Sequence, residues 1–112
     1  MKAVEFVKQV GWVDSSKVMV DWGNFTQIEK PTHFDSDLNI FIHKNDFTHL
    51  DESDVCILEL KTLVEAKELV DLYGGLFDAK KCLLLAPYAI DEDGSVDMLR
   101  EAIKLVEGLE NA

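Results

Sequence analysis

The sequence predicts an α+β fold, mostly helical with a small antiparallel β ribbon, in a single globular domain over residues 1–112. Apolar residues recur at steps of three and four along several segments, which is helical spacing. Residues 25–43 alternate only in part and are rich in β-branched and aromatic side chains, which favours strands. A chain of 112 residues with 47% hydrophobic and 29% charged residues has the size and composition of one folded domain.

The N-terminal part predicts two short helices. Apolar residues at helical spacing place the first near residues 2–10, and Gly11 ends it. The second is expected near residues 14–22, with a cap from Asp14, Ser15 or Ser16. The segment Lys17–Trp22 also fits a strand with alternate residues buried, and we prefer the helix.

The β ribbon is expected from about residue 25 to residue 43. Its two strands would be Phe25–Ile28 and Leu38–His43, joined by the turn-forming segment Glu29–Asp37. The polar segment Asn45–Asp54 then predicts a loop.

The next helix, residues 62–73, has the clearest boundaries. Thr62 and Glu65 form a capping box at its start, and Gly74 follows its end. Lys67 and Asp71, four residues apart, are expected to pair on its surface. The expected buried stripe is Leu63, Ala66, Val70 and Tyr73.

Two more helices are expected, near residues 76–86 and 96–107. Ser95 would cap the last one and Gly108 would end it, with Leu99, Ala102, Ile103 and Val106 buried. Cys82–Ala86 also fits a buried strand. In an alternative arrangement, Leu38–His43, Val55–Leu58 and Cys82–Ala86 are therefore strands of one sheet flanked by helices.

The charge of the chain is strongly negative. Eleven basic residues stand against 22 acidic ones, and residues 51–112 carry a net charge of −9 whereas residues 1–50 carry −2. Such a potential repels nucleic acids and anionic membranes and attracts a basic protein surface. The candidate interaction surface consists of Asp91, Glu92, Asp93, Asp97 and Glu101.

The motif search predicts no catalytic residue, metal site or cofactor. The segment Asp91–Gly94 resembles a calcium loop, but Ala89 and Arg100 occupy two positions that require carboxylates. His33, His43 and His49 lack the spacing of a zinc site. The serines occur in contexts typical of caps and turns.

Cysteine usage and hydropathy indicate a cytoplasmic protein. Cys56 and Cys82 lie in apolar surroundings without a redox or zinc spacing, so both are expected to be core thiols. The N-terminal residues lack the pattern of a signal peptide, and no apolar run reaches the roughly 20 residues that span a bilayer.

Two segments resemble a known group of proteins. Val4–Trp12 resembles the opening of small proteins encoded by tailed phages and prophages of enteric bacteria, and Glu68–Lys80 is similar to their second helix, double-glycine turn and following helix. Those proteins also tend to end with a helix like Met98–Ile103. The resemblance implies a phage-related origin and a helix after the glycines, and it implies no activity.

These observations favour a non-enzymatic protein-interaction or regulatory factor whose acidic C-terminal half meets a basic protein surface. One alternative is a nucleic-acid mimic that inhibits a DNA-binding protein, although interspersed lysines and arginines interrupt the acids. A second alternative is an enzyme whose active site no sequence motif marks.

Overall fold

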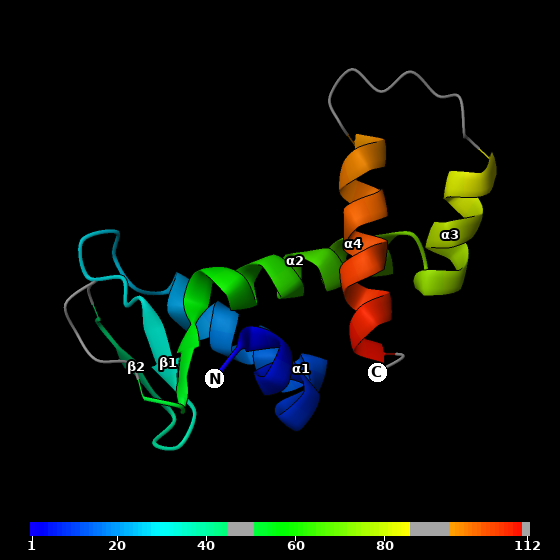
Figure 1. The fold of residues 1–112 in the computed structure, drawn as a ribbon. Helices are drawn as coiled ribbons and strands as arrows, with labels where there is room; N and C mark the ends of the chain where they lie inside the picture. The colour runs from blue at the N-terminus through cyan, green and yellow to red at the C-terminus, as the bar shows by residue number, and fades with distance from the viewer. Residues whose placement is uncertain (45–50, 86–94, 111–112) are drawn as a thin grey trace. The chain divides into compact units, whose positions relative to one another are not determined.

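The structure, a computed structural model, describes residues 1–44, 51–85 and 95–110. It confirms the α+β class, with mostly helical residues and a three-stranded antiparallel sheet. The elements in chain order are α1 (Ala3–Gly23), β1 (His33–Asp35), β2 (Ile40–Ile42), β3 (Asp54–Cys56), α2 (Ile57–Leu72), α3 (Leu76–Leu85) and α4 (Ser95–Glu110) (Figure 1).

The chain divides into two compact units. Unit 1 is Met1–Val64 and contains α1, the sheet and the first half of α2. Unit 2 is Glu65–Ala112 and contains the second half of α2 together with α3 and α4.

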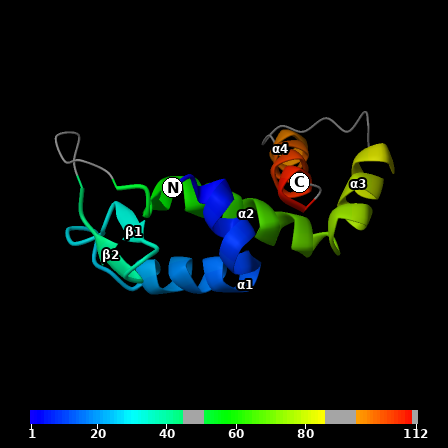
Figure 2. The same cartoon turned by 60° about the horizontal axis from the view of Figure 1, so that its bottom comes forward.

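Helix α1 is two helical segments joined at Gly11, as Figure 2 shows. Gly11 has φ 86° and ψ 173°, a conformation that glycine adopts far more readily than other residues. The predicted helices are confirmed, and the strand alternative for Lys17–Trp22 is wrong. The predicted cap is also wrong, because Ser15 is buried inside the helix and its hydroxyl donates to the Gly11 carbonyl.

The sheet has the order β2-β1-β3. Prediction of a strand over Phe25–Ile28 is wrong, since this segment forms turns and Glu29 N donates to Thr26 O at 3.1 Å. The central strand β1 instead lies in the segment that was expected to be a turn. Of the predicted strand Leu38–His43, only the β2 residues are extended.

Aromatic packing explains why β1 forms among turn-forming residues. Phe34 of β1 is buried, and its ring centroid lies 5.8 Å from that of Phe6 and 5.1 Å from that of Phe41. Phe41 in turn contacts Phe25 at 5.3 Å. Phe34 of β1 and Phe41 of β2 thus anchor two strands of only three residues each in one aromatic row.

Helix α2 begins directly after β3, five residues before the predicted start. The capping box is therefore wrong: Thr62 lies inside the helix, and its hydroxyl donates to Leu58 O at 3.0 Å. Buried side chains of α2 continue the core of unit 1; they are Ile57, Leu60, Leu63 and Val64.

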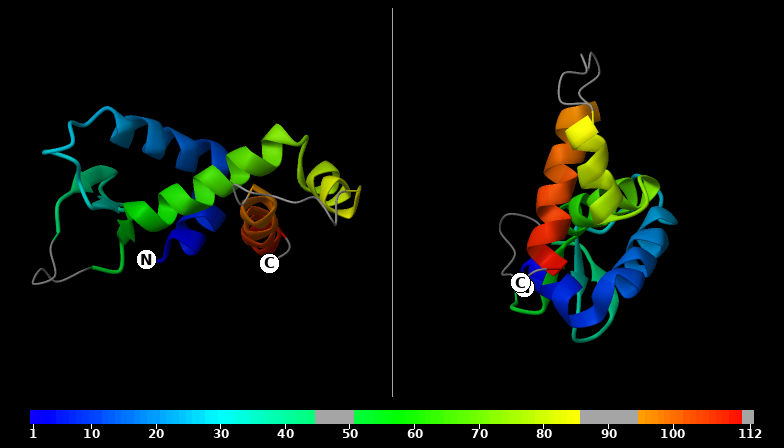
Figure 3. Two further views of the ribbon diagram at one scale, coloured as in Figure 1. Left: turned by 90° about the horizontal axis from the view of Figure 1, so that it is seen from above. Right: turned by 90° about the vertical axis from the view of Figure 1, so that its right-hand side faces the viewer.

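Unit 2 confirms the two C-terminal helices. The strand alternative for Cys82–Ala86 is wrong for the residues that the structure describes, because α3 is helical to Leu85; Ala86 lies outside them. The one-sheet arrangement is therefore wrong in its third strand, whereas Leu38–His43 and Val55–Leu58 do contribute β2 and part of β3 to one sheet. Helix α4 continues past Gly108. Figure 3 shows α3 beside α4, and the buried residues of unit 2 are Ala66, Val70, Ala79, Leu99, Ala102, Ile103 and Val106.

Three residues that were expected in the core are not fully buried. Cys82 is exposed on α3, and Cys56 is only partly buried. Tyr73, expected in the buried stripe, is exposed just after the end of α2.

Candidate functional site

The predicted acidic surface is described only in part. Asp97 and Glu101 are exposed on α4, whereas Asp91, Glu92 and Asp93 lie outside the described residues. Asp97 Oδ1 pairs with Arg100 Nη1 at 3.0 Å, and Glu101 Oε1 pairs with Lys104 Nζ at 3.4 Å. The charge of these two carboxylates is thus partly compensated by neighbours on the same helix.

The last turns of α4 carry two further acids, which pair with other helices of unit 2. Glu107 binds Lys80 of α3 at 2.7 Å, and Glu110 binds Lys67 of α2 at 3.1 Å. Lys67 also makes the predicted pair with Asp71, at 3.3 Å. Burial alone would lower the pKa of Lys67, but the two carboxylates raise that pKa above its ordinary value.

A second group of exposed acids lies on α2 beside an apolar side chain. Glu65, Glu68 and Leu72 are exposed and lie three and seven residues apart, so they share one face of the helix. We call these three residues the acidic α2 face. Leu72 is 82% exposed. Sequence reasoning missed this face because it assigned α2 only its buried stripe.

Helix α3 also exposes apolar side chains. Phe77 is 80% exposed, and Leu84, two helical turns further on, is exposed as well. Lys80 and Lys81 lie between them. This face is apolar and basic, unlike the acidic α2 face.

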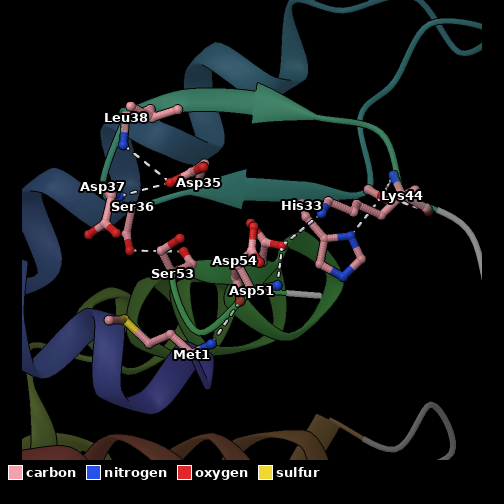
Figure 4. Close-up of polar contacts among 11 residues, drawn as sticks. Met1, His33, Asp35, Ser36, Asp37, Leu38, Lys44, Asp51, Ser53 and Asp54 are labelled. Carbon is pink, nitrogen blue, oxygen red and sulfur yellow. Dashed lines mark hydrogen bonds and ion pairs between the residues drawn. The ribbon is translucent and has the colours of Figure 1, made fainter. Parts of the chain in front are cut away.

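A polar cluster lies at the sheet of unit 1 (Figure 4). Its centre is Asp54 of β3, whose side chain is only 1% exposed. Asp54 Oδ2 accepts a hydrogen bond from Asp51 N at 2.8 Å and lies 3.3 Å from Lys44 Nζ. Its other oxygen, Oδ1, has no hydrogen-bond partner within the described part of the chain.

Burial and hydrogen bonding oppose each other at Asp54. Burial alone would raise its pKa, but the Asp51 N–H and the Lys44 ammonium outweigh burial and hold the pKa below the ordinary 3.8. Asp54 is therefore a buried, charged carboxylate at neutral pH. The sequence offered only a weak signal, an acid directly before the apolar run Val55–Leu58.

Two of the three histidines lie in the described part of the chain. His33 lies in β1 and His43 follows β2, while His49 lies outside the described residues. Within residues 1–44, 51–85 and 95–110, no group of three or more His, Cys, Asp or Glu side chains could hold a metal ion. In the same residues, no helix has the length and apolar character needed to cross a bilayer.

A hollow of about 300 Å³ opens in unit 1 between the start of α1 and α2. Lys2, Ala3, Val4, Glu59, Thr62 and Leu63 line it. It is at the lower end of the range for small-molecule sites. Its lining shares no residue with the polar cluster around Asp54.

Comparisons with known proteins leave function to the geometry alone. No protein-family model, no curated protein sequence and no solved structure matches the chain. The resemblance to small phage proteins therefore stays a prediction.

Proposed function

We propose that this protein is a non-enzymatic binding protein whose partner presents a basic segment with apolar side chains, and that this segment docks on the acidic α2 face of unit 2. One observation carries the proposal: Leu72 is 82% exposed on the same helix face as Glu65 and Glu68. An apolar side chain one helical turn from a carboxylate fits a partner that is both apolar and basic.

Burial of Leu72 would supply part of the binding free energy. Transfer of a leucine side chain from water to an apolar contact is worth about 1.5–3 kcal/mol. Because folding leaves Leu72 exposed, burial of this side chain by a partner would lower the free energy of the complex.

Charge would supply specificity and speed of encounter. Unit 2 has eleven acids and five bases, a net charge of −6 over 48 residues. We place the partner on α2, where Leu72 is exposed beside the acids, in preference to the α4 surface suggested by Asp97 and Glu101. Charge attraction of this kind weakens with salt.

The nucleic-acid-mimic alternative is less favoured. A mimic needs carboxylates in an unbroken row, whereas the α4 acids alternate with Arg100 and Lys104, to which two of them are paired.

We place the binding event in the cytoplasm, because Cys56 and Cys82 are free thiols, which fits a reducing compartment.

A pair of designed peptides tests the proposal. Both are amphipathic helices with the same leucines, and one carries Lys and Arg where the other carries Glu. We expect the basic peptide to bind the full chain, with a dissociation constant that rises steeply with salt, and the acidic peptide not to bind.

Two variants locate the contact. Leu72→Ser and Glu68→Lys change exposed side chains, so both should fold normally, and Leu72→Ser should weaken binding by roughly ten-fold or more. The matched control is Val13→Ser, which changes an exposed apolar residue of α1. Equal binding of the two peptides, or wild-type affinity in both α2 variants, would refute the proposal.

A further inference from the structure

The hydroxyl of Thr32 lies within hydrogen-bond distance of the imidazole of His33. Thr32 Oγ1 accepts a hydrogen bond from Lys44 N at 2.8 Å and donates to Lys44 O at 3.0 Å. Its third neighbour is His33 Nδ1, at 2.7 Å. A hydroxyl has one proton, so while Thr32 donates to Lys44 O, the imidazole donates to Thr32 from Nδ1. In this tautomer, neutral His33 keeps a lone pair on Nε2.

Burial favours this neutral state. Partial burial of His33 lowers its pKa below the ordinary 6.5, and the Lys44 ammonium and the N-terminal amine act in the same direction. The carboxylates of Asp54 on β3 and Glu59 on α2 oppose the shift. Two cations and two carboxylates thus act on the His33 ring. Of these four groups, Asp54 belongs to a strand of the same sheet.

Strand register brings His33 near the carboxylate of Asp54. In the β1–β3 ladder, His33 lies opposite Cys56, and Asp35 lies opposite Asp54. Residues two apart on a strand project from the same face, so His33 is the diagonal neighbour of Asp54 across the two strands. The backbones of such diagonal neighbours lie about 7–8 Å apart. Figure 4 shows both side chains on the side of the sheet where Lys44 reaches Asp54.

Asp54 has one oxygen ready for a new donor. Oδ2 already takes Lys44 and Asp51, whereas Oδ1 has no partner among the described residues. A buried acceptor without a donor is costly, and a charged donor nearby would relieve that cost. A second proton on His33, taken from solvent at Nε2, creates such a donor.

We propose that His33 is a proton-operated switch for the salt bridge between Lys44 and Asp54. While His33 is neutral, Asp54 is held by Lys44 and Asp51. When Nε2 takes a proton, the imidazolium competes with Lys44 for the carboxylate and repels the ammonium. The contribution of Lys44 to the stability of the sheet then falls in mild acid, at a pH where Asp54 itself is still charged.

Thermal unfolding of the full chain tests the switch. The loss of melting temperature caused by Lys44→Met is measured at about pH 8 and about pH 5, on either side of the ordinary histidine range. We expect the loss at about pH 8 to be at least twice that at about pH 5. In a His33→Gln background, which keeps a neutral donor, the loss should be the same at both values. A loss that does not change with pH in the presence of His33, or one that still changes in its absence, would overturn the switch.

A second measurement needs no variant at the salt bridge. Nitrogen NMR of the labelled wild-type chain reports which imidazole nitrogen of neutral His33 carries the proton, and the carboxyl carbon of Asp54 is followed in the same titration. The proton should lie on Nδ1 and move to Nε2 in Thr32→Val, and the Asp54 signal should shift with the His33 midpoint. A proton on Nε2 in the wild type, or an Asp54 signal that ignores His33, would also refute the proposal.

Discussion

The hydroxyl of Ser15 donates a hydrogen bond to the carbonyl oxygen of Gly11, 2.7 Å away, inside α1. Ser15 is fully buried, and Gly11 adopts φ 86° and ψ 173° at the junction of the two helical segments. The bond closes the first turn after the kink from within the helix.

Gly11→Ala should destabilise the protein through its backbone alone. A Cβ at Gly11 would meet no atom within 4 Å, but its positive φ is strained for any residue with a side chain. We expect a loss of about 1–3 kcal/mol in the free energy of unfolding, measured by urea denaturation.

The matched control is Gly108→Ala, in the interior of α4. A Cβ there also has open space, and the backbone is helical, so alanine should stabilise by about 0.5–1 kcal/mol. If both variants change stability in the same direction, the kink at Gly11 is not a backbone requirement.

Thr62→Ala distinguishes the structure from the capping box that the sequence suggests. A threonine cap would cost about 1 kcal/mol on removal. In the structure Thr62 is an exposed interior residue that bonds back to Leu58 O, so alanine should stabilise α2 by roughly 0.5 kcal/mol. Chemical denaturation decides, and a loss near the cap value would place the start of α2 at Thr62.

Truncation of two leucines of α2 should change the stability of the protein by very different amounts. Leu60 is fully buried in unit 1, and Leu60→Ala should cost about 2–5 kcal/mol in unfolding free energy. Leu58→Ala, two residues earlier, removes a side chain that is 66% exposed and should change stability by no more than about 0.5 kcal/mol. Comparable losses in both variants would mean that the orientation of α2 is wrong.

Asp54 should contribute stability that is lost only in strong acid. Its pKa in the folded chain lies below the ordinary 3.8, so the unfolded chain binds the proton more readily. The contribution is complete above pH 3.8 and disappears as pH falls through the folded pKa.

Asp54→Asn should therefore lower stability at neutral pH, by about 1–3 kcal/mol for the lost charged partner of Lys44. It should also flatten the dependence of stability on pH below 3.8. Urea denaturation across that range measures both effects. If the free energy of unfolding of the variant falls with pH below 3.8 as steeply as that of the wild type, Asp54 does not titrate as the structure implies.

Periodicity predicted the helices because their buried residues recur at regular steps. Leu99, Ala102, Ile103 and Val106 were correctly placed in the core. Boundaries were less predictable: Thr62 looked like a cap, but burial of Ile57 and Leu60 extends α2 backwards to β3. A capping sequence carries less free energy than the burial of two large apolar side chains.

Strands of three residues leave almost no pattern in a sequence. Phe34 stands alone between His33 and Asp35, and only its contacts with Phe6 and Phe41 identify β1. The acidic α2 face was equally hidden, because Leu72 fits an apolar helix and nothing in the sequence says that it is exposed. Both features depend on contacts between segments far apart in the chain.

The most direct test of the binding proposal is a proton–nitrogen NMR titration of the full chain with the basic amphipathic peptide at low salt. The proposal predicts the largest amide shift changes at the acidic α2 face, Glu65, Glu68 and Leu72, and their loss in Leu72→Ser. Changes centred on α1 or the sheet, or an unaltered pattern in Leu72→Ser, would contradict it.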